Sequence, residues 1–181
     1  FANALRDVKF YRHALFAQIN IDDAVACQVS LEDNHIHVLN GAAFDSEINL
    51  ELLTGPALLL LLAQLNVFCL HAGSIATPFG NVAIIAESGA GKSTLSSHVD
   101  DDWSQLSDDI LPLKGKKLLP NFPQLKLPNA VSEGRFGLDD SLRVIFRVNP
   151  IPCGDIQFRR LSTVEAMLQV VRHTVAAKLF N

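Results

Sequence analysis

The stretch of the sequence with the clearest chemical character is a short run that is rich in glycine and contains one lysine. It reads Ala86-Glu87-Ser88-Gly89-Ala90-Gly91-Lys92-Ser93-Thr94. Its glycines let the backbone turn N–H groups inward around a polyphosphate, Lys92 adds a positive charge, and the Ser93 hydroxyl is a ligand for Mg²⁺. The spacing predicts a phosphate-binding loop with these contact residues: Ser88, Gly89, Ala90, Gly91, Lys92, Ser93 and Thr94.

One position of this loop departs from the strict pattern, because Ala86 stands where that pattern has glycine. Alanine adopts a positive φ only at a cost in free energy. The alternative interpretation is a turn rich in glycine and serine that carries a lysine by coincidence. The flanking sequence favours the loop: the apolar run 81–85 predicts a strand before it, and residues 94–99 predict a helix whose N-terminus faces the phosphates.

A pair of carboxylates, Asp108-Asp109, forms the second chemical feature, and Asp108 follows Lys92 by only sixteen residues. With one helix and a turn between them, we expect the pair to end the strand beside the loop strand, next to the γ-phosphate and its Mg²⁺. Phosphoryl transfer needs a metal clamp and a group that orients or deprotonates the acceptor hydroxyl, and two adjacent carboxylates divide these roles. The alternative is that one of them caps a turn.

Three histidines, one of them near these motifs, each have two interpretations. His71 ends an apolar strand just before the loop strand, and is either a satisfied core residue or a hydrogen-bond partner for one of the acidic pair. His35 and His37 flank Ile36 on one face of a strand, where a solvated face is favoured over a metal site because no cysteine or carboxylate partner is marked.

The remaining pattern predicts the elements that position these residues. We expect a hairpin about Asp33-Asn34, a buried helix that starts at 54–56 and ends near Asn66, and a strand at 68–76. We also expect strands at 143–148 and, more weakly, 155–159. A capping box of Ser162 and Glu165 starts a final helix with an apolar stripe that favours core packing: Met167, Val170, Val171, Val175 and Leu179. Because a tight turn at 78–81 joins two strands before the loop, the sheet should be mixed.

The organisation predicted is α/β, with a small β-rich N-terminal subdomain at 1–50 and a P-loop core with a mixed sheet at 51–181.

A hydrophobic content of 49% and a charged content of 19% indicate a globular chain, and a net charge of −4 gives no basic surface for nucleic acid. The longest apolar run, 57–63, is too short for a membrane span. Three scattered cysteines favour a reducing cytoplasm. Since the sequence starts at Phe1, we expect that residues precede it.

Three motifs together resemble the HPr kinase/phosphorylase superfamily. They are Leu70-His71-Ala72-Gly73-Ser74, the loop 87–94 and Leu106-Ser107-Asp108-Asp109, in the order and spacing of that family's catalytic core. The proline-rich stretch 120–127 and the helix start 161–166 resemble its smaller relatives. Thr94 stands where the bifunctional HPr enzymes usually have glutamate, and their C-terminal signature is not found. The sequence therefore looks more like the compact kinases, including those encoded with lasso-peptide biosynthesis.

This resemblance implies a fold related to the HPr kinase C-terminal domain and to phosphoenolpyruvate carboxykinase. It implies an ATP- and Mg²⁺-dependent serine kinase that acts on a peptide or small protein, with a homo-oligomer by analogy. It assigns Asp108 as general base, places Ser93 and Asp109 around the metal, and puts His71 beside the acidic pair.

Other functions remain open from the sequence. The main alternative is a regulatory or sensor protein that binds ATP without phosphate transfer, which Ala86 and region 129–142 keep open. A small-molecule kinase is disfavoured because about 85 residues precede the loop. Basic residues for phosphate or an acidic substrate, each otherwise a solvated surface residue, are Arg135, Arg143, Arg147, Arg159 and Arg160.

Overall fold

The computed structural model describes residues 7–39, 46–98, 102–119, 140–149 and 155–175. The chain divides into two compact units, Phe1–Val67 and Phe68–Leu179. The first contains an antiparallel sheet and a helical segment, and the second a mixed sheet with helices, so the chain is α/β as predicted. The boundary lies later than the expected one at residue 50, because the helical segment groups with the N-terminal strands.

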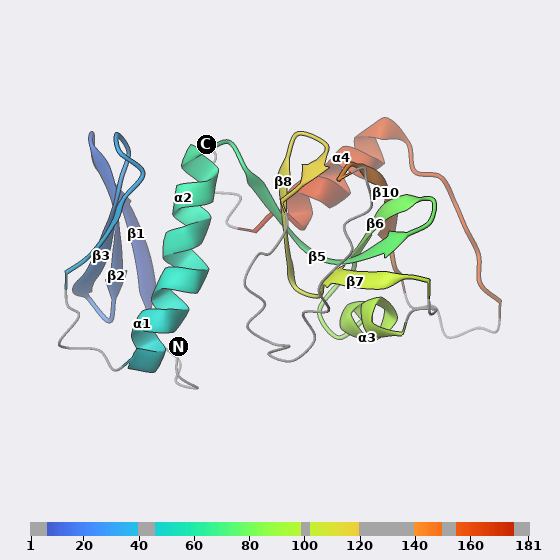
Figure 1. Ribbon diagram of the computed structural model, residues 1–181, viewed down its shortest axis with the longest axis horizontal. Helices are drawn as coiled ribbons and strands as arrows, with labels where there is room; N and C mark the ends of the chain where they lie inside the picture. The colour runs from blue at the N-terminus through green and yellow to red at the C-terminus, as the bar shows by residue number, and fades with distance from the viewer. Residues whose placement is uncertain (1–6, 40–45, 99–101, 120–139, 150–154, 176–181) are drawn as a thin grey trace. The chain divides into compact units, whose positions relative to one another are not determined.

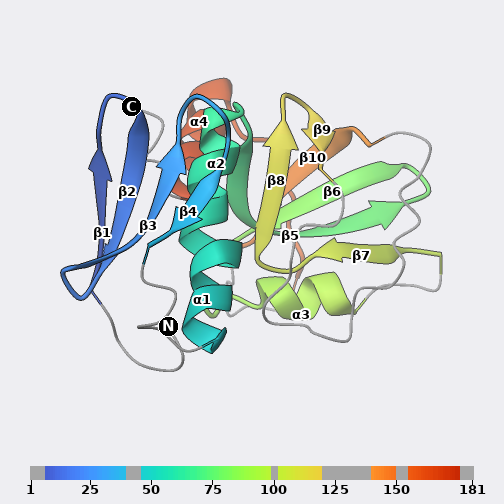
Figure 2. The same cartoon turned by 60° about the vertical axis from the view of Figure 1, so that its left-hand side comes forward.

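The N-terminal unit has a four-stranded antiparallel sheet (Figure 1), and its order β1-β2-β3-β4 can be followed in Figure 2. Its strands are β1 (Val8–Arg12), β2 (Phe16–Ile21), β3 (Ala24–Ser30) and β4 (Ile36–Val38). The predicted hairpin is confirmed, since β3 and β4 pair and the turn residue Asn34 has φ 57°. Cys27 and Val29 on β3 are fully buried, whereas His35 and His37 are exposed on the solvated side, as favoured.

The helical segment of this unit begins earlier than predicted. It comprises α1 (Ser46–Leu52), a π-helical turn (Leu53–Ala57) and α2 (Leu58–Gln64). The predicted start at 54–56 is confirmed for the second helix, because Gly55, with φ −104° and ψ −107°, is non-helical and separates two helices at a kink, with Pro56 at the start of the second. The helix before the kink, α1, was not predicted. Proline fits there since it has no N–H to donate to the preceding turn. The expected end is confirmed, as Asn66 has φ 57° beyond α2.

The C-terminal unit is built around its longest strand, β5 (Phe68–Thr77). The sheet order is β10-β6-β5-β8-β9, with β7 also paired to β5 (Figure 2). The other strands are β6 (Gly80–Ile85), β7 (Ser104–Ser107), β8 (Ile110–Lys114), β9 (Lys117–Leu118) and β10 (Leu142–Arg147). β10 runs parallel to β6 while β6, β7 and β8 run antiparallel to β5, so the predicted mixed sheet is confirmed.

This strand order corrects one expectation about the acidic pair. The strand that leads to Asp108 is β7, and it pairs with β5 rather than with the loop strand β6. β5 lies between them because the turn after Thr77 folds β6 back against β5 as a hairpin. The acidic pair therefore approaches the loop across β5.

Two helices complete this unit: α3 (Lys92–Ser97) packs on β5, β6 and β7, and α4 (Thr163–Arg172) follows the predicted capping box. Ser162 and Glu165 form that box, which confirms the helix start. The apolar stripe is only partly core: Val170 packs against the core cluster, but the side chains of Met167 and Val171 are exposed, against the expectation.

One expected strand is absent, and several expectations fall on residues that the structure does not describe. The weak strand predicted at 155–159 is wrong, because these residues form no strand. The expectations for 120–127, Arg135 and Leu179 lie outside the described residues. Within the described ranges, no helix combines the length and apolar character needed to cross a membrane.

A buried cluster joins the central strands of the C-terminal unit. It consists of Leu70, Ala72, Ala83, Ile85, Leu111, Leu113 and Leu118. Because these residues come from β5, β6, β8 and β9, their packing holds together the strand ends that carry the loop and the acidic pair.

Candidate functional site

The predicted loop connects β6 to α3, which is the strand, loop and helix order that a phosphate loop requires. Gly89 and Gly91 have φ +79° and +85°, and a Cβ at either position would meet no atom within 4 Å. Glycine is therefore favoured at both for its backbone freedom rather than for lack of space. The N–H of Ala90 donates to the Glu87 carbonyl at 3.1 Å, which closes a turn at the exposed tip.

Ala86 fits the loop without strain. It is 1% exposed, and it is not among the described non-glycine residues that have a positive φ. Because the backbone here avoids the left-handed region, the glycine of the strict pattern is not needed for conformation. The departure at this position therefore does not argue against the loop.

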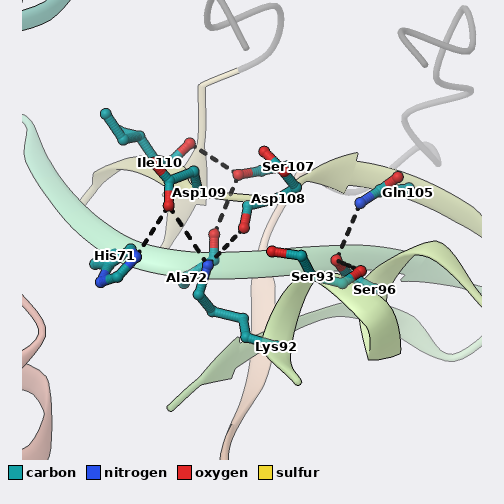
Figure 3. Close-up of polar contacts among 10 residues, drawn as sticks. All are labelled: His71, Ala72, Lys92, Ser93, Ser96, Gln105, Ser107, Asp108, Asp109 and Ile110. Carbon is teal, nitrogen blue, oxygen red and sulfur yellow. Dashed lines mark hydrogen bonds and ion pairs between the residues drawn. The ribbon is translucent and has the colours of Figure 1, made fainter. Parts of the chain in front are cut away.

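Lys92 connects the loop to the acidic pair. Its side chain is 8% exposed, and its Nζ lies 3.6 Å from Asp109 Oδ1. The same Nζ donates a 2.6 Å hydrogen bond to the backbone carbonyl of Asp108 (Figure 3). A buried ammonium group is stable only with such partners, so the lysine and the acidic bend depend on each other.

The acidic pair occupies the bend between β7 and β8. Ser107 stabilises this bend, because its hydroxyl lies 2.8 Å from the Ile110 carbonyl and 3.2 Å from the Ala72 carbonyl. The Ala72 N–H donates to the Asp109 carbonyl at 3.1 Å, which attaches the bend to β5. Asp108 is only 3% exposed, whereas the side chain of Asp109 is 28% exposed. The two neighbours thus have different environments.

His71 is the residue of β5 that contacts the acidic pair. Its Nε2 lies 2.9 Å from Asp109 Oδ1, so the interpretation as a hydrogen-bond partner is confirmed. Its backbone N–H donates to the His173 carbonyl at 2.7 Å, just past the end of α4. The ring is therefore held on a strand that is bonded on both sides, to β8 and to the segment after α4.

Ser93 lies in the first turn of α3, where it is exposed. In Figure 3 its hydroxyl points toward the side of the site on which Lys92 and the acidic pair lie. Thr94 follows it on the exposed side of the helix. All residues predicted for the loop and the acidic pair thus lie on consecutive or directly bonded parts of one unit.

The packing under α3 involves residues that sequence reasoning missed. Ser96 is fully buried; its hydroxyl donates to the Ser93 carbonyl at 3.1 Å and accepts from Gln105 Nε2 on β7 at 3.0 Å. A Cβ at Gly73 would lie 3.0 Å from both Cβ and Oγ of Ser96. The glycine of β5 therefore lets α3 sit close to the sheet.

Of the described arginines that were named from the sequence, Arg147 lies next to the loop and the others lie elsewhere. Arg147 ends β10 next to the loop, where its Nη2 lies 4.0 Å from Glu87 Oε1. Arg143 lies at the opposite end of that strand beside Gly80, and Arg159 pairs with Glu165 at 3.0 Å. Arg160 is exposed. Sequence reasoning missed Arg172, whose Nη2 is 3.1 Å from Glu87, because a basic residue in a last helical turn is unremarkable.

The oxygen donors of Ser93 and Asp109 fit a magnesium ion. Mg²⁺ in nucleotide sites takes one or two carboxylates and hydroxyls, and completes its shell with substrate phosphates and water. Among the described residues, no three side chains of histidine, cysteine, aspartate or glutamate gather as a metal-binding group. A magnesium ion held by Ser93 and Asp109 would therefore need further ligands from outside these two side chains.

No protein-family model matches this sequence, and no curated protein matches it. Inference about function therefore depends on the geometry of the loop, Lys92, His71 and the acidic pair.

Proposed function

We propose that this chain is an ATP- and Mg²⁺-dependent serine kinase that phosphorylates a peptide or small protein, on a fold related to the HPr kinase C-terminal domain and phosphoenolpyruvate carboxykinase. The observation that supports it most is the contact of Lys92 Nζ with the backbone carbonyl of Asp108 and the carboxylate of Asp109. A phosphate loop alone is compatible with many activities. A loop whose lysine reaches an acidic bend brings the phosphate-binding cation and a candidate base together, as transfer to a hydroxyl requires.

The reaction assigns a role to each of these residues. Asp108 accepts the proton of the acceptor serine, whose oxygen forms a bond to the γ-phosphorus as the bond from that phosphorus to the β,γ-bridging oxygen breaks. ADP then leaves with the bridging oxygen. Lys92 neutralises charge on the phosphates, and the backbone N–H groups of 88–93 bind the β-phosphate. Burial of Asp108 supports its role because a shielded carboxylate interacts strongly with the bound hydroxyl.

His71 and Asp109 support the metal side of the site. Asp109 and the Ser93 hydroxyl would hold Mg²⁺, which would withdraw charge from the phosphates. His71 is a positioning residue, because its Nε2 contacts Asp109 rather than the acceptor. A partner that orients a metal-binding carboxylate is a common feature of such sites. We also place the protein in the cytoplasm, where ATP is available.

The test is a phosphate-transfer assay read by mass spectrometry, with Mg²⁺-ATP and serine-containing peptides encoded by neighbouring genes. Asp108→Asn should abolish transfer and leave ATP binding within about twofold of the unmodified protein, because the substitution keeps the shape of the side chain. His35→Ala, in the other unit, is the matched control. Full transfer by Asp108→Asn would refute the proposal. Tight ATP binding without transfer to any acceptor would favour the nucleotide sensor.

A further inference from the structure

Two arginines and one glutamate form a cluster at the first residues of the loop. Glu87, the second residue after β6, has a side chain that is 51% exposed, with Arg172 Nη2 at 3.1 Å and Arg147 Nη2 at 4.0 Å from the same Oε1. Arg147 comes from β10, on the opposite side of β6 from β5. The loop is thus flanked by Lys92 and the acidic pair on one side and by a guanidinium on the other.

Arg172 is attached to the reaction side of the site through its neighbour. The next residue, His173, is 6% exposed and accepts a 2.7 Å hydrogen bond from the backbone N–H of His71. His71 in turn contacts Asp109 through its ring. The last turn of α4 is therefore held beside His71 on β5, while the Arg172 side chain extends to the loop.

The pairing with Glu87 leaves the arginines incompletely satisfied. A separation of 4.0 Å between Arg147 and Glu87 is longer than a hydrogen bond, and Arg147 Nε is buried with no acceptor among the described residues. Arg172 is 62% exposed, so water screens its pair with Glu87. A single carboxylate thus faces two guanidinium groups, whose planar donors suit the several oxygens of a phosphate better.

We propose that Arg172, supported by Arg147, binds the γ-phosphate of ATP, and that Glu87 holds these guanidinium groups beside the loop until the phosphate displaces it. This inference rests on the proposed function, because it takes ATP as the ligand of the loop. Arg172 then contributes a positive charge to the transferring phosphoryl group, whose equatorial oxygens carry the charge that develops. The exchange also makes the site select ATP over ADP, which lacks that phosphate.

The experiment compares the affinities of Mg²⁺-ATP and Mg²⁺-ADP by calorimetry. Arg172→Gln should weaken ATP binding about tenfold, which corresponds to one charge-assisted hydrogen bond, and ADP binding less than about twofold. Glu87→Gln should strengthen ATP binding up to about fivefold, as expected when a competing exposed ion pair is removed. Arg147→Ala should weaken ATP binding more than ADP binding, because Arg147 supports Arg172 on the γ-phosphate. Arg143→Ala is its matched control, since Arg143 lies at the far end of the same strand.

A structural role of Arg172 predicts a different pattern. If the arginine only stabilises α4, Arg172→Gln will weaken ATP and ADP binding equally, and Glu87→Gln will weaken both. Either result overturns the inference. Arg172→Lys, which keeps the charge and loses the planar fork, should recover part of the preference for ATP.

The failure of this inference is distinguishable from failure of the proposed function. If peptide is phosphorylated but Arg172→Gln leaves both transfer and the preference for ATP unchanged, the inference is wrong and the kinase assignment stands. If the preference depends on Arg172 but no acceptor is phosphorylated, the γ-phosphate site stands and the kinase assignment is wrong. If the protein binds neither nucleotide, both are wrong.

Discussion

His71 Nε2 and Asp109 Oδ1 lie 2.9 Å apart, although thirty-eight residues separate them in the chain. Lys92 Nζ approaches the same carboxylate oxygen at 3.6 Å. One carboxylate therefore receives a histidine from β5 and a lysine from the loop, so each of the three constrains the position of the others.

Loss of the histidine should affect turnover more than nucleotide binding. In the proposed kinase, His71→Ala should lower kcat about 10- to 100-fold, the usual effect of removing a partner that orients a metal-binding carboxylate. His71→Gln should recover part of this rate because its amide Nε2 reaches the same oxygen. Steady-state kinetics with varied Mg²⁺-ATP measures both. An equal kcat for all three proteins would contradict a positioning role.

Loss of the lysine should weaken nucleotide binding and also destabilise the fold. Lys92→Met keeps the buried volume but removes the charge, so Mg²⁺-ATP affinity should fall at least about tenfold. Stability should also fall, by up to about 3–5 kcal/mol, because the substitution leaves the acidic bend without its buried cation. Chemical denaturation and calorimetry test the two parts, with exposed Lys114→Met as control. Unchanged ATP affinity would contradict the loop assignment.

Alanine should lower the stability of the protein at Gly73 of β5 but not at the neighbouring Ser74. Gly73→Ala places a Cβ 3.0 Å from Ser96, which is held by Ser93 and Gln105, so we expect a loss of about 1–3 kcal/mol in the free energy of unfolding. Ser74→Ala should be neutral or stabilising, since Ser74 Oγ is buried with no hydrogen-bond partner among the described residues. Urea unfolding compares them, and equal losses would contradict the packing argument.

The capping box of α4 should make stability depend on pH in the acid range. Hydrogen bonds from the Ser162 backbone and hydroxyl, together with Arg159, lower the pKa of Glu165 from 4.5 to about 2. Because the folded pKa is the lower one, the stabilisation is complete above pH 4.5 and is lost as the pH falls toward 2. Glu165→Gln should therefore be less stable than the unmodified protein near neutrality. The two unfolding midpoints should converge toward pH 2; a constant difference would contradict the assignment.

Local sequence signals predicted the parts of the fold that depend on neighbours in the chain. The strand before the loop, the helix after it, and the capping box at Ser162 each follow from residues a few positions apart. The helix before the Gly55 kink, Ser46–Leu52, was missed, since the glycine and the proline mark only the start of the helix that follows them. The exposed face of α4 was missed because a stripe of apolar residues indicates amphipathic character without showing what covers it.

In the site, too, the sequence predicted the residues but not the way in which the fold brings them together. The residue types and spacing of the loop, of His71 and of the acidic pair were sufficient to nominate them together, and the hydrogen bond between His71 and Asp109 agrees. The way in which these residues come into contact depends on strand order, because β5 lies between β6 and β7. No local sequence pattern specifies this order. Glu87 meets Arg172 only because segments far apart in the chain pack on one sheet. Such contacts result from burial of apolar strand faces, a non-directional force that acts on the whole unit, and for this reason they are absent from any short stretch of sequence.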